Sequence, residues 1–366
     1  MKDKLTVALF LVVLLGLFAA NVFMPDAPLS FGERRRLAQL PKLSASDVMS
    51  GKFMGDFDKY STDQFVGREL FRRLKTSVDQ SILQKKDSNG LFRVGDGAFS
   101  IEYPLQENNV DFMCERLNVL YDRYLSGMNV YFCIVPDKNY YLPRDGSYLL
   151  MDYNKLGAMM QEKLPAGIGH IEIYDALSAE NYFLSDGHWR QESLRPVTQA
   201  LGDAMGYSAS FDPASYEHLS YNPFYGAYYG QLAGLASADT IVWLENDVTR
   251  SAVVTSLGHP GQEKLPIYNT DGLTGMDSYD VFLYGAQPLI TLDNPLNTAG
   301  RELILFRDSF GSSLAPIMLE DYSRITLVDI RYITQDLLAE YIEFGEQDVL
   351  LMFSSTIINN SIGIIR

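Results

Sequence analysis

A histidine follows a carboxylate by two residues in the segment Asp186–Trp189, and a serine follows a long apolar run in the segment Leu303–Gly311. The chain has only four histidines, so a histidine beside an acidic residue is distinctive. A serine hydroxyl becomes a nucleophile when a neighbouring histidine accepts its proton and a carboxylate orients that histidine. If Ser309 meets His188 and Asp186 in space, the three side chains can carry out acyl transfer.

The position of Ser309 in the chain suits this chemistry. The serine comes directly after an apolar stretch typical of a buried strand and directly before a predicted helix. In open parallel sheets, functional groups gather at the carboxyl ends of the strands. The free N–H groups and the dipole of a helix N-terminus stabilise developing negative charge, as an oxyanion hole must.

A structural role competes with the catalytic one for each of these segments. Asp308 or Ser309 could simply cap the helix that follows, and Asp186 could cap the helix after His188. Taken alone, each segment favours capping, because capping residues are common at such junctions. The presence of both segments at strand-to-helix junctions favours a shared site.

Short segments along most of the chain carry a resemblance to a known family. They are Glu33–Ala38 with Pro41, Gly55–Tyr60, Asp63–Arg68, Val135–Lys138, Asp186–Trp189, Phe224–Tyr229, Arg307–Gly311 and Val328–Tyr332. In this order they resemble the DHHW family of bacterial exported proteins, relatives of the alginate O-acetyltransferase domains with an SGNH-hydrolase-like fold. The resemblance implies Ser309 as nucleophile, His188 as general base and Asp186 as the group that orients it.

The sequence departs from the family pattern at two positions. The family name denotes Asp-His-His-Trp, whereas position 187 is Gly. Arg307 stands where the serine block usually has Gly. The separate Gly and Asn oxyanion blocks of ordinary SGNH hydrolases are not identified. We therefore expect the Ser309 backbone N–H to be the oxyanion donor, with Arg331 as a helper.

Other residues are candidates for contact with a substrate. Arg331 and Lys138 lie near the ends of predicted strands, so either can face the site; the alternative for both is solvent contact or a salt bridge. Tyr225, Tyr228 and Tyr229 can stack on sugar rings, or can pack within the core or a loop.

The elements that must position these residues alternate between strands and helices. The predicted strands are 129–135, 171–174, 302–306, 325–329 and 349–353, and the predicted helices are 110–125, 148–164, 190–205, 310–319 and 334–344. This alternation predicts an α/β fold, a parallel sheet with helices on both faces. Residues 206–300 are rich in Tyr, Gly and Asn and are predicted to be a β-rich insertion that decorates the sheet.

The N-terminus contains a candidate membrane segment within residues 1–24. The run Leu5–Phe23 has no charged residue and would be about 28 Å long as a helix, close to the ~30 Å hydrocarbon core of a bilayer. Lysines before it and Pro25-Asp26 after it favour a single-pass anchor with an extracytoplasmic body. A cleaved signal peptide, with a weak site at Ala19–Asn21, is the alternative.

Two further regions follow the candidate anchor. Residues 25–90 form a predicted helical region, with aromatic residues at helical spacing over 46–83 and a break at Gly67. Residues 91–366 form the predicted SGNH-like domain. This domain begins with a predicted hairpin over 91–103 that turns at Gly95–Gly97.

Composition excludes some classes of partner and cofactor. A net charge of -16 argues against nucleic acid, since phosphate binding requires clustered Lys and Arg. No cysteine or histidine cluster indicates a metal site, and no cofactor is expected. Cys114 and Cys133 lie in apolar surroundings and are expected to be buried thiols, although export would permit a disulfide. The remaining histidines have no neighbouring constellation.

Together these patterns support two hypotheses of different classes. The first is an exported, membrane-anchored O-acetyltransferase or esterase that acts on a cell-envelope or secreted polysaccharide through Ser309, His188 and Asp186. A membrane partner that supplies acyl groups would fit this hypothesis. The second is a non-catalytic glycan-binding or envelope-assembly protein that retains the fold, which the departures at Gly187 and Arg307 motivate.

Overall fold

A seven-stranded sheet forms the centre of the protein in the computed structural model, which describes residues 2–30, 33–83, 85, 87, 90–232, 236–261, 264–298 and 300–365. The strand order is β6-β5-β13-β11-β12-β10-β9. The strands are β5 (Asn129–Val135), β6 (Gly169–Ile171), β9 (Val253–Ser256), β10 (Leu289–Asp293), β11 (Glu302–Arg307), β12 (Arg324–Val328) and β13 (Asp348–Ser354). β6, β5, β13, β11 and β12 run parallel, and β10 pairs antiparallel with both β12 and the edge strand β9.

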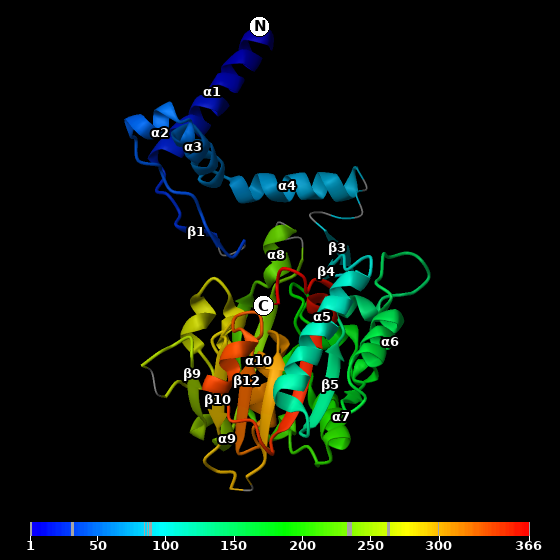
Figure 1. Ribbon diagram of the computed structural model, residues 1–366. Coiled ribbons are helices and arrows are strands. Elements are labelled where there is room, and N and C mark those ends of the chain that lie inside the picture. Colours follow the sequence, from blue (N-terminus) through cyan, green and yellow to red (C-terminus); the bar gives the residue numbers. More distant parts are fainter. Residues whose placement is uncertain are drawn as a thin grey trace.

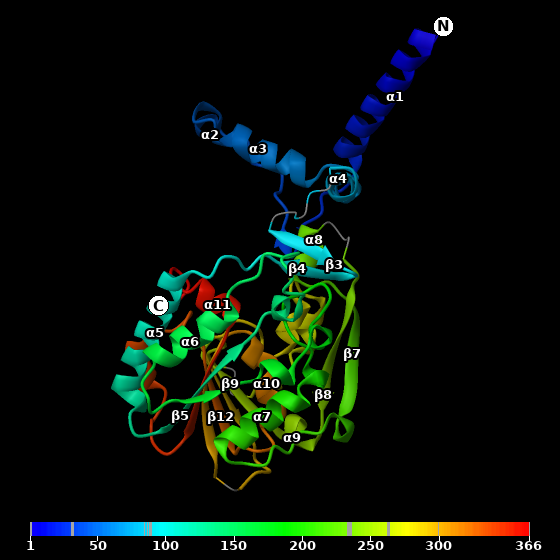
Figure 2. The ribbon, with the colours of Figure 1, turned by 90° about the vertical axis from the view of Figure 1, so that its right-hand side faces the viewer.

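Helices cover both faces of this sheet, as the alternation of elements predicts. They are α5 (Glu107–Leu120), which continues into a π-helical turn (Tyr121–Leu125), α6 (Tyr153–Lys163), α7 (Arg195–Met205), α10 (Phe310–Met318) and the short α11 (Ser355–Asn359). Figure 2 shows α5 and α6 on one side of the strands and α7 and α10 on the other. The predicted α/β class is therefore confirmed.

The residues of the central strands are buried, so the sheet forms the core of the protein. All seven residues of β13 are buried, as are the last five of β11, because each strand is covered by neighbours and by helices on both faces. Such continuous apolar runs are typical of parallel strands buried on both sides. Cys133 on β5 and Cys114 on α5 are buried free thiols, as predicted.

The insertion is β-rich, but part of it belongs to the central sheet. β7 (Glu217–Phe224) and β8 (Asp239–Glu245) form a separate hairpin, with α8 (Ala227–Gln231) between them and α9 (Asp247–Ser251) after them. β9 and β10 instead extend the main sheet. Ile290 and Leu292 on β10 are fully buried and continue the core laterally, so this region does more than decorate the sheet.

Element boundaries differ from the predicted ones where local capping decides them. The helix predicted over 148–164 begins at Tyr153, because the Asp152 side chain accepts a hydrogen bond from the Lys155 N–H and caps it. The helix predicted over 190–205 is a 3-10 turn followed by α7, which has a proline in its first turn. The predicted helix at 334–344 is only a 3-10 turn, Gln335–Glu340.

The N-terminal region stands apart from the sheet. α1 (Lys2–Phe23) has no buried residue and is long and apolar enough to cross a membrane. A small ladder of β1 (Leu29–Ser30) with β2 (Arg35–Arg36) follows, and then α2 (Ala45–Met49), α3 (Lys52–Asp63) and α4 (Arg68–Ser81). In Figure 1, α1 projects away from the body and α4 lies between α1 and the body. The predicted hairpin after it is present as β3 (Leu91–Val94) and β4 (Gly97–Ser100).

Leu350→Ala tests the role of the central strand in stability. Leu350 is fully buried on β13, so its truncation should lower the free energy of unfolding by about 2–5 kcal/mol. The matched control is Leu296→Ala, because Leu296 is 57% exposed and its loss should change stability by less than about 0.5 kcal/mol. Urea unfolding of the two variants measures both values. Equal losses would contradict the placement of the core.

Candidate active site

Ser309, His188 and Asp186 form a continuous chain of hydrogen bonds. The distance between His188 Nε2 and Ser309 Oγ is 2.7 Å, and that between His188 Nδ1 and Asp186 Oδ1 is 2.6 Å. Ser309 lies between β11 and α10, at the carboxyl end of a central parallel strand. The structure thus brings together residues that are 121 positions apart in the chain. Their catalytic roles remain a prediction.

The backbone around Ser309 bears on the capping alternative. The Ser309 side chain makes no capping hydrogen bond to α10. Asp308 takes that role, since its Oδ1 accepts from the Phe310 N–H at 3.0 Å and its Oδ2 accepts from the Ser354 N–H at 2.7 Å. Asp308 therefore ties the start of α10 to the end of β13, and the Ser309 hydroxyl is left to His188.

Asp186 is buried and uses both of its oxygens. Oδ1 accepts from the His188 backbone N–H at 3.0 Å as well as from the ring, and Oδ2 accepts from the Ala227 N–H at 2.7 Å and from Arg34 at 3.3 Å. Burial alone would raise the pKa of Asp186. His188 and Arg34 lower it by a larger amount, so the pKa of this carboxyl is well below its usual range. The carboxylate is ionised at neutral pH.

Aromatic residues hold the His188 ring in place. The Tyr279 ring stacks on it at a centroid distance of 4.0 Å and an interplanar angle of 15°, and Phe310 lies at 5.0 Å. The adjacent Trp189 is fully buried, and its indole N–H donates to Ser313 Oγ on α10 at 2.9 Å. Tyr279 donates to the same oxygen at 3.0 Å. The histidine segment is thereby fastened to the helix that Ser309 begins.

Lys138 is buried against the backbone that carries Asp186, and its contact with a substrate remains a prediction. Its side chain is buried, and Nζ donates to the carbonyl oxygens of Phe183 (3.0 Å), Leu184 (3.3 Å) and Asp186 (2.8 Å). Burial lowers the pKa of Lys138 to about 8, against the opposing effect of Asp186. The lysine thus fixes the backbone that carries the carboxylate.

Arg331 makes the salt bridge that was its alternative role. Its Nε and Nη2 atoms donate to the two carboxylate oxygens of Asp329 at 2.8 and 2.6 Å. The buried Arg307 lies at 3.8 Å from the same carboxylate and passes over Gly311, where an added Cβ would lie 2.7 Å from Arg307 Cβ. The help of Arg331 at the oxyanion remains a prediction.

The tyrosines lie beside the site in two different ways. The rings of Tyr225 and Tyr229 contact each other with centroids 4.4 Å apart and planes tilted by 41°, and both line a cleft of about 560 Å³ against the N-terminal region. The Tyr228 hydroxyl instead points at Gly187, where an added Cβ would lie 2.6 Å from that oxygen. This explains the first departure from the family pattern, because Tyr228 occupies the space of a side chain at position 187. Stacking of these rings on sugar remains a prediction.

Sequence reasoning missed two residues that contact the site. The one sequence signal for Arg34 is its place in the family-like segment Glu33–Ala38. Tyr279 lies in a 3-10 turn (Ser278–Val281) of the insertion, where no periodicity marks it.

The mostly parallel sheet, with a serine at the carboxyl end of β11, defines an α/β protein of the kind that the sequence predicts. No protein-family model and no curated protein matches the sequence. Among solved structures, a DHHW family protein from Eubacterium siraeum shares the fold at a TM-score of 0.61 and 20% identity, over 76% of this chain and 95% of that one.

Solved structures of two other proteins are similar at lower identity. Bacillus cereus PatB1 has a TM-score of 0.59 and 16% identity, over 73% of this chain and 96% of that one, and PatB1 with a sulfonyl adduct has a TM-score of 0.57. The O-acetyltransferase domain of Pseudomonas putida AlgJ has a TM-score of 0.45 and 12% identity, over 74% of this chain and 92% of that one.

Gly226→Ala tests the support of Asp186. A Cβ at Gly226 would lie 2.4 Å from the Ser185 carbonyl oxygen and 2.5 Å from Asp186 Cβ, so the loop must move. We expect a loss of about 100-fold in kcat/KM on p-nitrophenyl acetate, the size of effect that a ~1 Å misplacement produces.

Gly157→Ala is the matched control for this variant. Gly157 lies in α6 with no atom within 4 Å of an added Cβ. The alanine should leave kcat/KM unchanged and stabilise the helix by up to about 1 kcal/mol. An active Gly226→Ala enzyme would show that the loop does not hold the carboxylate.

Proposed function

We propose that this protein is an acyl-ester enzyme that moves an acetyl group onto, or off, a hydroxyl of a cell-envelope or secreted polysaccharide. The observation that carries the proposal is the hydrogen-bond chain from Asp186 through His188 to Ser309, with distances of 2.6 and 2.7 Å. Nucleophile, base and orienting carboxylate stand in the order that acyl transfer requires.

The first half of the reaction forms an acyl-enzyme. Asp186 accepts a hydrogen bond from the Nδ1–H of His188, so the Nε2 lone pair is free to accept the Ser309 proton. Ser309 Oγ then attacks the carbonyl carbon of the donor ester. The tetrahedral oxyanion is stabilised at the N-terminus of α10, where the Ser309 N–H is the candidate donor. As the intermediate collapses, His188 returns the proton to the leaving alcohol, and the acetyl group stays on Ser309.

The second half regenerates the serine. His188 removes a proton from the acceptor hydroxyl, which attacks the acetyl carbon, and then returns a proton to Ser309 Oγ. A sugar hydroxyl gives transfer and water gives hydrolysis. The family resemblance of the sequence favours transfer, and the adjacent aromatic rings of Tyr225 and Tyr229 suit a sugar acceptor.

The location that we propose follows from the N-terminal region. α1 would anchor the protein in the cell membrane by a single pass, with the body outside the cytoplasm. A membrane partner that delivers acyl groups would then reach the site from the same side. In the alternative function, the protein binds glycan or assists envelope assembly without catalysis.

Ser309→Ala tests the proposed function. PatB1 shares the fold and has a structure with a sulfonyl adduct, and sulfonyl fluorides modify activated hydroxyls, so such a reagent is a direct probe. We expect phenylmethylsulfonyl fluoride to add one sulfonyl group to the wild-type protein, at Ser309, and to add none to the variant. Turnover of p-nitrophenyl acetate should fall by at least about 10³-fold. Intact-protein mass spectrometry and absorbance measure the two effects.

Ser312→Ala is the matched control on the same helix. Ser312 is buried, and its hydroxyl has no hydrogen-bond partner among the described residues. Its loss should change neither labelling nor turnover. Equal labelling of Ser309→Ala would refute the nucleophile. A correctly folded wild-type protein that is never labelled and still binds glycan would favour the non-catalytic alternative.

A further inference from the structure

A hairpin close to the candidate membrane anchor reaches the active site. β1 and β2 pair in an antiparallel ladder, and Arg34 lies in the turn between them with a positive φ of 52°. From there its guanidinium extends to Asp186, a residue 152 positions away. The Arg34 side chain is only 15% exposed although it belongs to a surface hairpin.

The Arg34 guanidinium joins two carboxylates that support His188. Nη1 donates to Asp186 Oδ2 at 3.3 Å, and Nη2 contacts Asp277 Oδ2. The other oxygen of Asp277 accepts from the Tyr279 N–H at 3.0 Å, and the Tyr279 ring stacks on His188. Arg34 therefore binds the carboxylate that orients the His188 imidazole. It also binds the turn that carries Tyr279, whose ring stacks on that imidazole.

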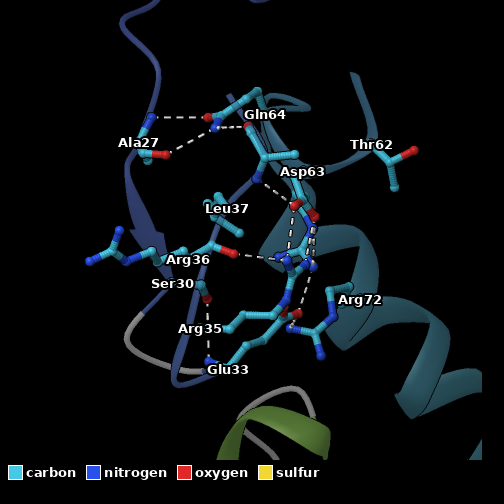
Figure 3. Close-up of polar contacts among 12 residues, drawn as sticks. Ala27, Ser30, Glu33, Arg35, Arg36, Leu37, Thr62, Asp63, Gln64 and Arg72 are labelled. Carbon is cyan, nitrogen blue, oxygen red and sulfur yellow. Dashed lines mark hydrogen bonds and ion pairs between the residues drawn. The ribbon is translucent and has the colours of Figure 1, made fainter. Parts of the chain in front are cut away.

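An ionic cluster fixes the hairpin that presents Arg34 (Figure 3). Arg35 donates to both oxygens of Asp63 at the end of α3, at 2.9 and 2.5 Å, and to Glu33 at 2.6 Å. Glu33 also pairs with Arg68 at 2.6 Å and Arg72 at 2.5 Å on α4. Since the residues on either side of Arg34 are bound in this way, the arginine is held in position before any substrate arrives.

We propose that Arg34 is a positioning residue for the Ser309–His188–Asp186 site, so that the membrane-proximal hairpin completes the active site of the catalytic body. This inference rests on the proposed function. Arginine suits the role, because its planar fork binds two carboxylates at once and keeps its charge when buried. Lysine offers a point charge and cannot reproduce the fork.

Loss of Arg34 should change both the geometry and the charge of the site. Asp186 would keep the Lys138 ammonium near its backbone and the Tyr228 hydroxyl nearby. It would lose the guanidinium that donates to its Oδ2. Asp277 would lose its ion pair with Arg34, and Asp280 would lose the nearby positive charge of the guanidinium.

Arg34→Gln, measured in full-length protein in detergent, tests the proposal. We expect kcat on p-nitrophenyl acetate to fall by about 10–100-fold while KM changes little, because the support acts on the base and not on the substrate. Arg34→Lys should recover part of kcat, because it restores the positive charge without the planar fork.

Arg36→Gln is the matched control, because Arg36 lies in the same hairpin and is exposed. It should leave kcat and KM as in the wild type. Thermal unfolding of all three variants separates positioning from loss of fold. An Arg34→Gln enzyme with unchanged kcat would overturn the proposal, as would a faster one, which would make the hairpin inhibitory.

A readout that needs no turnover separates this proposal from the function it rests on. The His188 Nδ1 proton, hydrogen-bonded to Asp186, should give a low-field ¹H NMR signal in the wild type that shifts or disappears in Arg34→Gln and not in Arg36→Gln. An inactive wild type with that shift would refute the esterase chemistry and leave the positioning contact standing. An active wild type whose signal and kcat are both insensitive to Arg34 would refute the positioning role alone.

Discussion

The Asp186 carboxylate is the group on which the site depends, because it is buried and both of its oxygens are committed to separate parts of the chain. A buried carboxylate is costly unless hydrogen bonds and a counter-charge compensate it. Here His188, the Ala227 N–H and Arg34 provide that compensation. The buried charge is therefore compensated by groups from the histidine segment, the α8 turn and the N-terminal hairpin, which meet at this carboxylate.

The sheet and α10 position Ser309, whereas loop segments position His188 and Asp186. Ser309 is set by β11 and α10, and Asp308 locks that junction to the neighbouring strand β13. His188 has no regular element beneath it and is held by side chains, chiefly Trp189 and Tyr279, which meet at Ser313 on α10. Both the serine and the histidine segment are therefore held by α10, which keeps His188 Nε2 and Ser309 Oγ at hydrogen-bond distance.

Local patterns predicted the parts of this arrangement that depend on local physics. The apolar runs at 129–135 and 302–306 match β5 and β11 closely, since strands buried on both faces leave a strong signal. The junction logic that paired Ser309 with the Asp186 segment agrees with the observed distances. Arg34 and Tyr279 were not foreseen, because a salt bridge across 152 positions and a ring stacked from a 3-10 turn leave no periodic trace.

The contact between Gly187 and Tyr228 has a consequence for the evolution of such sites. The two positions compete for one volume, because a β-carbon at 187 would lie 2.6 Å from the Tyr228 hydroxyl. A homologue with histidine at position 187 needs a smaller or displaced side chain at position 228. Substitutions at positions 187 and 228 should therefore occur together. The two positions should covary among homologous sequences while Asp186, His188 and Trp189 stay constant.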